Sequence, residues 1–265
     1  MKRTNENKKE SKEIPNIIIA FMLIALLTLF YNTMWNHKAE SIDSIVKIQR
    51  KMPFEKKIDE KENIRLIIKK DYSGLLQLVN RNNAIKKINI KDELVVPNVN
   101  LVAGEGNEKN LLRKEAAKAL EEMFQAANNE KGLRLYLNSG YRSEERQEQV
   151  YNAEIYNIGE EGKGFVAKPG HSEHHTGLAA DLTCKTVKFK LEQEFEETNS
   201  GKWLIENSYK YGYILRYPKG KEDETGYEYE PWHYRYVGKE ISMYMKKNDL
   251  TLEGLYKNIG NNLAK

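Results

Sequence analysis

The sequence has very little cysteine and very little net charge for its length. Cys184 is the single cysteine among 265 residues, which excludes an intrachain disulfide and any zinc cluster built from several cysteines. The 43 basic residues nearly balance the 39 acidic ones, for a net charge of +4. This balance indicates no basic surface for nucleic acid, so we expect no nucleic-acid partner. A bound metal would need histidine or carboxylate ligands.

Charged residues are absent from Ile14 to Asn36, and most of this stretch is apolar. Five basic residues lie among the thirteen before it, while no convincing cleavage site or lipid-attachment cysteine follows it. We predict a cytoplasmic basic head at residues 1–13 and an uncleaved transmembrane anchor at 14–36. The rest of the chain would then be extracytoplasmic on a bacterial cell surface, in a single-pass membrane protein. Cleavage of the anchor would give a secreted form.

The remaining chain divides into a stalk and one folded domain. Residues 37–70 are dense in charge and contain one proline, which is typical of a charged, partly helical stalk. Over residues 71–265, helical and strand patterns mix without regular βαβ repetition, so the expected class is α+β. The acidic segment 189–199 is expected to be solvated. The predicted elements are helices at 111–128 and 202–211, helices capped by Ser143 and Thr251, and strands at 133–138, 178–183, 213–216 and 232–237.

Histidine is scarce, but four of the five histidines lie in two short segments. The first segment, PGHSEHHTGLAADL, contains His171, His174 and His175, and after a turn at Gly177 it places Asp181 on the strand face opposite the leucines. A buried carboxylate needs a cation or a metal beside it. An arginine partner for Asp181 is the plainer interpretation. The neighbouring imidazoles favour zinc, although spacing alone does not choose among the three histidines.

Two further segments contain side chains that suit hydrolysis. In YEPWHYRYVG, Glu230 precedes His233 by three residues, so the histidine can bind a metal while the glutamate acts as general base. In NSGYRSEERQ, Arg142 lies at a predicted strand-to-helix corner, where a guanidinium can bind a carboxylate or an oxyanion. Taken singly, these patterns also fit a surface glutamate with a packed histidine, and an arginine in an ordinary ion pair.

Together the three segments resemble the VanY-type zinc D-Ala-D-Ala carboxypeptidases. This group includes the peptidoglycan L,D-carboxypeptidases and is related to the VanX dipeptidases and the Hedgehog signalling domain. The resemblance covers about three-fifths of the chain, roughly residues 75–237. The matching residues are Ser172, His174, Gly177, Ala179 and Asp181 of the pattern S-x-H-x-x-G-x-A-x-D, Glu230 and His233 of an E-x-x-H pair, and Ser139, Arg142 and Gln147 at the arginine corner.

The resemblance implies a fold, a cofactor and a set of roles. The fold would be a single Hedgehog/VanX-like zinc peptidase domain, with a small antiparallel sheet flanked by helices, that holds one Zn²⁺ ion. The implied roles are metal ligands at His174, Asp181 and His233, the catalytic base at Glu230, stabilisation of the substrate carbonyl or terminal carboxylate by Arg142, and further substrate binding by Gln147, Ser172 and Ser139.

The expected activity is removal of the C-terminal D-Ala from peptidoglycan stem peptides that end in D-Ala-D-Ala, by attack of a zinc-bound water with the help of Glu230. One alternative is an L,D-carboxypeptidase that acts on tetrapeptide stems. Another is a non-catalytic, zinc-containing module that binds the cell wall, which Glu230 argues against because a structural zinc site needs no base. The expected partners are the stem peptide and, through the amino-terminal helix, the membrane. We expect a monomer.

Overall fold

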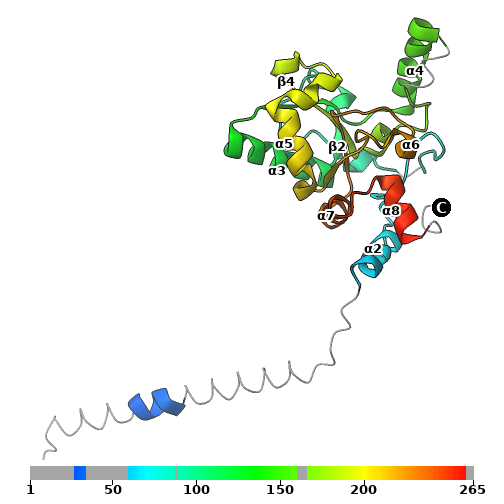
Figure 1. The fold of residues 1–265 in the computed structure, drawn as a ribbon. Coiled ribbons are helices and arrows are strands. Elements are labelled where there is room, and N and C mark those ends of the chain that lie inside the picture. The colour runs from blue at the N-terminus through cyan, green and yellow to red at the C-terminus, as the bar shows by residue number, and fades with distance from the viewer. Residues whose placement is uncertain (1–26, 34–58, 87–88, 160–165, 261–265) are drawn as a thin grey trace, which may run out of the picture. The chain divides into compact units, whose positions relative to one another are not determined.

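The computed structural model describes residues 27–33, 59–86, 89–159 and 166–260. A compact unit begins at Asp59 (Figure 1). Of the predicted anchor, only residues 27–33 are described, and they are helical with exposed side chains. Within the described ranges, no helix has both the length and the apolar character needed to cross a membrane. The predicted head at 1–13 and the predicted stalk up to residue 58 lie outside the described residues.

The compact unit mixes helices with short strands, as the α+β prediction requires. Its helices are α2 (Glu60–Lys69), α3 (Lys114–Lys131), α4 (Glu144–Ile158), α5 (Asn199–Asn207), α6 (Glu222–Thr225), α7 (Lys239–Lys247) and α8 (Leu252–Ile259). Its strands are β1 (Leu94–Val95), β2 (Leu112–Arg113), β3 (Leu135–Ser139), β4 (Ala179–Cys184), β5 (Tyr213–Leu215) and β6 (His233–Tyr236). Among the 3₁₀ turns between them are η4 (Glu173–Thr176), η6 (Gln193–Glu197) and η7 (Ser208–Tyr211).

The larger sheet is antiparallel and has the strand order β3–β4–β6–β5. Strand β4 is an inner strand, and all of its residues are buried. The register pairs Ser139 of β3 with Asp181 of β4, and Asp181 with His233 of β6. Three polar residues from distant segments therefore lie in one row across the sheet, where short side chains can meet.

Helix α3 packs against this sheet through its apolar face. Leu120 and Met123 are fully buried in one hydrophobic cluster with residues of β3 and β4. The helix ends at Gly132, whose positive φ of 64° suits glycine. The predicted start at residue 111 is wrong by three residues. Leu112 and Arg113 pair with β1 as strand β2, and this pairing delays the helix until Lys114.

The compact unit starts twelve residues before residue 71, the predicted start of the folded domain. Helix α2, from the predicted stalk, buries Ile64 and Ile68 in a second hydrophobic cluster with residues of α7 and α8. Figure 1 shows α2 and α8 side by side although almost the whole domain separates them in sequence. The last part of the predicted stalk therefore belongs to the core, because burying its apolar face stabilises the helix.

The sequence predicted a solvated acidic segment at 189–199. In the structure, part of this segment packs against the rest of the domain. Its turn η6 buries Phe195 completely. Gly201 of α5 lies so close that an added Cβ would be 2.1 Å from the Phe195 carbonyl oxygen. The hydroxyl of Tyr229 donates to Glu196 at 2.8 Å, and the Gln193 amide donates to the Tyr229 carbonyl at 3.1 Å. The segment thus supports the loop that precedes β6.

Candidate active site

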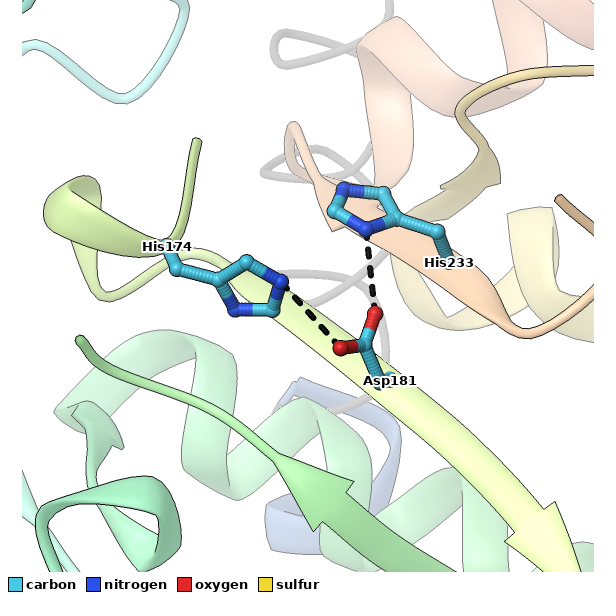
Figure 2. A group of neighbouring side chains, drawn as sticks. All are labelled: His174, Asp181 and His233. Carbon is cyan, nitrogen blue, oxygen red and sulfur yellow. Dashed lines mark hydrogen bonds and ion pairs between the residues drawn. The ribbon is translucent and has the colours of Figure 1, made fainter. Parts of the chain in front are cut away.

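The structure brings His174, Asp181 and His233 together, and all three are buried. Their possible ligand atoms lie within 4.8 Å of one another. His174 Nε2 is 3.2 Å from one Asp181 oxygen, and His233 Nδ1 is 3.0 Å from the other (Figure 2). We call these three residues the His–Asp–His cluster. The sheet register places Asp181 of β4 beside His233 of β6, and the turn η4 supplies His174.

The hydrogen bonds of His174 direct one ring nitrogen into this cluster. His174 Nδ1 donates to the Gly140 carbonyl at 2.6 Å, because a carbonyl can only accept. Burial lowers the pKa of His174, which favours the neutral ring that a metal ion needs. Nε2 faces a carboxylate oxygen of Asp181 at 3.2 Å, a contact that a proton or a metal ion between the two atoms would stabilise. Two imidazoles and a carboxylate suit Zn²⁺.

The charges of the other two members are coupled. Burial alone would raise the pKa of Asp181, but His174 and His233 hold it well below its usual range. Burial disfavours a charged His233, yet its hydrogen bonds to Asp181 and Glu173 raise its pKa to about 9. These shifts favour an ionised Asp181 and a protonated His233 at neutral pH. This histidine must lose a proton before its nitrogen can bind a metal.

Glu230 lies beside the cluster but is not part of it. One of its carboxylate oxygens is 3.7 Å from His233 Nδ1, and the side chain is 20% exposed. The backbone amide of Glu230 donates to the Tyr217 carbonyl at 3.1 Å. The Glu230 carbonyl accepts from the His233 amide, also at 3.1 Å. Burial raises the pKa of Glu230 to about 7, although the charge of His233 opposes this. A carboxylate with a pKa near neutrality is suited to accept and return a proton.

The arginine corner, which we define as Ser139, Arg142 and Gln147, joins β3 to α4. Its turn needs glycine at 140, because a Cβ there would lie 2.3 Å from the Leu111 carbonyl oxygen. Arg142 donates through Nη1 to Gln147 Oε1 at 2.9 Å and through Nη2 to Ser139 Oγ at 3.3 Å. The structure therefore holds the guanidinium at two of its three nitrogens.

The hydrogen bonds of Gln147, Ser172 and Arg142 show which polar groups of the cleft are still available to bind a substrate. Gln147 is fully buried, and its Nε2 donates to the Ala167 carbonyl at 2.7 Å, so both ends of its amide are engaged. Ser172 lines the cleft, and its hydroxyl accepts from the His174 amide at 3.4 Å. Arg142 has five N–H groups and makes two side-chain hydrogen bonds within this corner, so it is the member with donors to spare.

The neighbouring histidines have other partners. His175 Nδ1 donates to the Arg142 carbonyl at 2.7 Å, and its Nε2 accepts from the Gly170 amide at 3.1 Å. His171 Nδ1 donates to the Asn80 carbonyl at 2.8 Å. Spacing could not choose among these histidines, whereas the structure turns only His174 toward Asp181.

The cluster opens into a cleft of about 170 Å³. Its walls include Arg142, Glu230, His171, Tyr217, Tyr227 and Trp232. The Tyr217 ring packs on the His233 imidazole with centroids 4.9 Å apart, and Tyr227 packs on Tyr217 at 4.7 Å. Tyrosine-rich sequence near residue 230 was the signal for this wall, but it could not tell cleft residues from core residues.

Sequence reasoning missed Glu173, which lies between the motif residues Ser172 and His174. Its side chain is completely buried and contacts His233, Arg216 and Arg235. Burial opposes its ionisation, but the two guanidinium groups hold the pKa of Glu173 well below its usual range. The available signal was the pair of arginines, because Arg216 directly follows the strand Tyr213–Leu215 and Arg235 lies within β6. Their partner could not be chosen among 39 acidic residues.

An α+β fold with a His–Asp–His cluster, a glutamate and an arginine in one cleft defines a peptidase with a candidate metal centre. Residues 109–239 match the family described as VanY, D-alanyl-D-alanine carboxypeptidase. YodJ of Bacillus subtilis, which is named as a carboxypeptidase, is 45% identical over 205 residues, or 77% of this chain and 73% of YodJ. The chain belongs to the VanY family of carboxypeptidases, which confirms the resemblance found in its motifs.

Solved structures agree with this assignment. The LdcB LD-carboxypeptidase, described with the basis of its peptidoglycan recognition, has a TM-score of 0.68 and 45% identity, covering 72% of this chain and 89% of that one. A variant of the vancomycin-resistance D,D-pentapeptidase VanY in complex with Zn(II) has a TM-score of 0.54 and 32% identity, covering 68% and 97%. The family therefore includes both L,D- and D,D-enzymes and a zinc-containing member.

Proposed function

We propose that this protein is a zinc-dependent carboxypeptidase that releases the C-terminal D-Ala from peptidoglycan stem peptides. The observation that carries the proposal is one cleft in which Glu230 lies beside the His–Asp–His cluster and Arg142 lines the wall with N–H groups to spare. A base, a cation site and a spare donor are the groups that peptide hydrolysis needs. A module that only binds the wall would need neither Glu230 nor this donor.

His174, Asp181 and His233 are the residues that would hold the zinc ion. When bound, zinc polarises the scissile carbonyl and acidifies water. Glu230 takes a proton from the attacking water and later gives it to the leaving amine of D-Ala. Arg142, which lines the cleft, donates from its guanidinium to a substrate oxygen, either the developing oxyanion or the terminal carboxylate. Ser139 and Gln147 act on the substrate through Arg142, because they hold its guanidinium in place.

The LdcB likeness supports the tetrapeptide stem as the substrate, with cleavage between an L-configured centre and D-Ala. Its identity to this chain is 45%, against 32% for the D,D-pentapeptidase. Cleavage of pentapeptides that end in D-Ala-D-Ala is the second candidate, supported by the family description. Both activities release the same product, so the proposed roles of Glu230 and Arg142 are the same in each.

The test is to incubate the purified full-length protein with defined tetrapeptide and pentapeptide stems and to measure released D-Ala. We expect release from the tetrapeptide, loss of release after chelation and its return with Zn²⁺. Glu230→Gln is the matched control, and it should bind zinc but lose about 100- to 10,000-fold in rate because the base is gone. Release from the pentapeptide alone would reverse the substrate assignment. Release from neither peptide would sink the proposed function.

We also propose that the site works outside the cytoplasm, tethered through residues 14–36. The support is the uncharged, largely apolar sequence of that stretch and the basic head before it. A mass measurement of the protein extracted from bacterial membranes tests the tether. An intact amino terminus in the membrane fraction is expected, and recovery of only a truncated protein from the medium would contradict it.

A further inference from the structure

Glu173 lies behind the His–Asp–His cluster, on the side of His233 that faces away from Asp181. Its carboxylate has two different sets of contacts. Oε1 accepts from Arg216 Nε at 2.7 Å and from Arg235 Nη1 at 2.8 Å. Oε2 faces His233 Nε2 at 3.5 Å. One oxygen is thus taken by two arginines, and the other is left for the histidine.

The two arginines are themselves fixed in place. Both are completely buried. Arg216 also donates to the two oxygens of Glu253 on α8, at 2.8 and 2.7 Å, and Arg235 also donates to the carbonyls of Leu75 and Gln77, both at 3.0 Å. The two glutamates balance the two arginines in charge, and the arrangement orients Glu173 from behind.

The His233 ring lies between two carboxylates. Nδ1 faces Asp181 at 3.0 Å, while Nε2 faces Glu173. The Tyr217 ring packs on its face and restricts its rotation. When Nε2 keeps its hydrogen and donates it to Glu173, Nδ1 is the nitrogen left without a hydrogen and directed into the cluster.

We infer that Glu173 is a positioning residue that selects the His233 tautomer with hydrogen on Nε2, so that Nδ1 is the metal-binding atom. The inference rests on the proposal that the cluster holds zinc. A carboxylate that accepts from the distal nitrogen of a ligand histidine fixes the orientation of the ring and strengthens its binding. Here the carboxylate is supplied by the residue next to another ligand in the sequence, His174.

Glu173→Gln tests this role in a directed way. The two arginines can only donate, so they would hold the amide oxygen of Gln and leave its NH₂ facing His233 Nε2. A donor at that point favours the opposite tautomer. Glu253→Gln is the matched control, because it also removes one carboxylate from Arg216 but does not touch His233.

The measurement is zinc affinity of the full-length protein, by competition with a chromophoric chelator. We expect about a 10- to 100-fold loss for Glu173→Gln and about a threefold change or less for Glu253→Gln, although both variants lose stability to urea because each breaks a buried pair. Equal losses of zinc affinity in the two variants would overturn the inference. If the wild type binds zinc but releases no D-Ala, the proposed function fails and the inference does not.

A second measurement needs no variant, in case Glu173→Gln does not fold. Two-bond ¹H–¹⁵N correlation spectra of protein labelled at histidine report which ring nitrogen carries hydrogen. In the zinc-loaded wild type we expect hydrogen on His233 Nε2 and metal on Nδ1. Metal on Nε2 would overturn the inference whatever the variants do.

Discussion

The His–Asp–His cluster and the arginine corner share a cleft but are built differently. The cluster collects residues 174, 181 and 233 from three elements, and it places two imidazoles around one carboxylate. The arginine corner lies within residues 139–147, and its hydrogen bonds hold the Arg142 guanidinium through two of its nitrogens. The donor set of the cluster thus suits a metal ion, whereas the corner suits a substrate oxygen.

This difference implies that the two regions fail in different ways. Loss of a cluster residue should remove the metal and with it all activity, because no other side chain replaces the ligand. Loss of a corner residue should leave the metal in place and weaken only the stabilisation of substrate and transition state. Substitutions in each region, ordered from the largest expected effect, can confirm or break this separation.

The largest effect is expected for His174→Ala. This variant should lose zinc and show D-Ala release no greater than background, because the imidazole that faces Asp181 is gone. Zinc content of the purified protein and peptide cleavage are the measurements. His175→Ala is the control, since both nitrogens of that ring are already used by Arg142 and Gly170, and it should retain zinc. Zinc lost from His175→Ala and kept by His174→Ala would reverse the ligand assignment.

An intermediate effect is expected for Arg142→Ala. Removing a donor to the developing oxyanion typically costs about 100- to 1,000-fold in rate, and we expect a loss of that size in kcat/KM. Zinc content should stay at the wild-type level, which separates this variant from His174→Ala. Loss of zinc from Arg142→Ala would show that the two regions are not independent.

The smallest effect is expected for Gln147→Ala. Gln147 holds Arg142 at 2.9 Å, and loss of a hydrogen bond to a charged group costs about 1.5 kcal/mol or more, or roughly tenfold in kcat/KM. In the Arg142→Ala background the same change should cost less than about twofold, because the group it holds is absent. Gln149→Ala on the exposed face of α4 is the control and should have no effect. Additive losses would mean that Gln147 contacts the substrate itself.

Sequence patterns predicted the elements whose signals are local. The helix that follows Ser143 is α4, and the Ser143 side chain accepts from the Arg146 amide as a cap should. Thr251 caps α8 in the same way. The observed boundaries differ from the predicted ones where a segment packs against a partner that is distant in sequence. Residues 112–113 became strand β2 because β1 lies beside them, and α2 joined the core because α8 covers its apolar face.

The chemical groups of the site could also be predicted, because they lie in three motifs of high specificity. Their arrangement could not. Which histidine faces Asp181 depends on where the Gly140 carbonyl lies, and Gly140 belongs to another strand end. The orientation of the Arg142 guanidinium depends on Gln147 and Ser139, which accept from two of its nitrogens.

By itself, the sequence determined the class of the fold, the helix caps at Ser143 and Thr251 and the chemical groups of the three motifs, because periodicity, capping and motif spacing act over a few neighbouring residues. Only the tertiary structure decided that Ser139, Asp181 and His233 share one row and that Glu173 reaches His233 from behind. Strand register and the pairing of buried charges depend on partners far along the chain, and no local pattern specifies them.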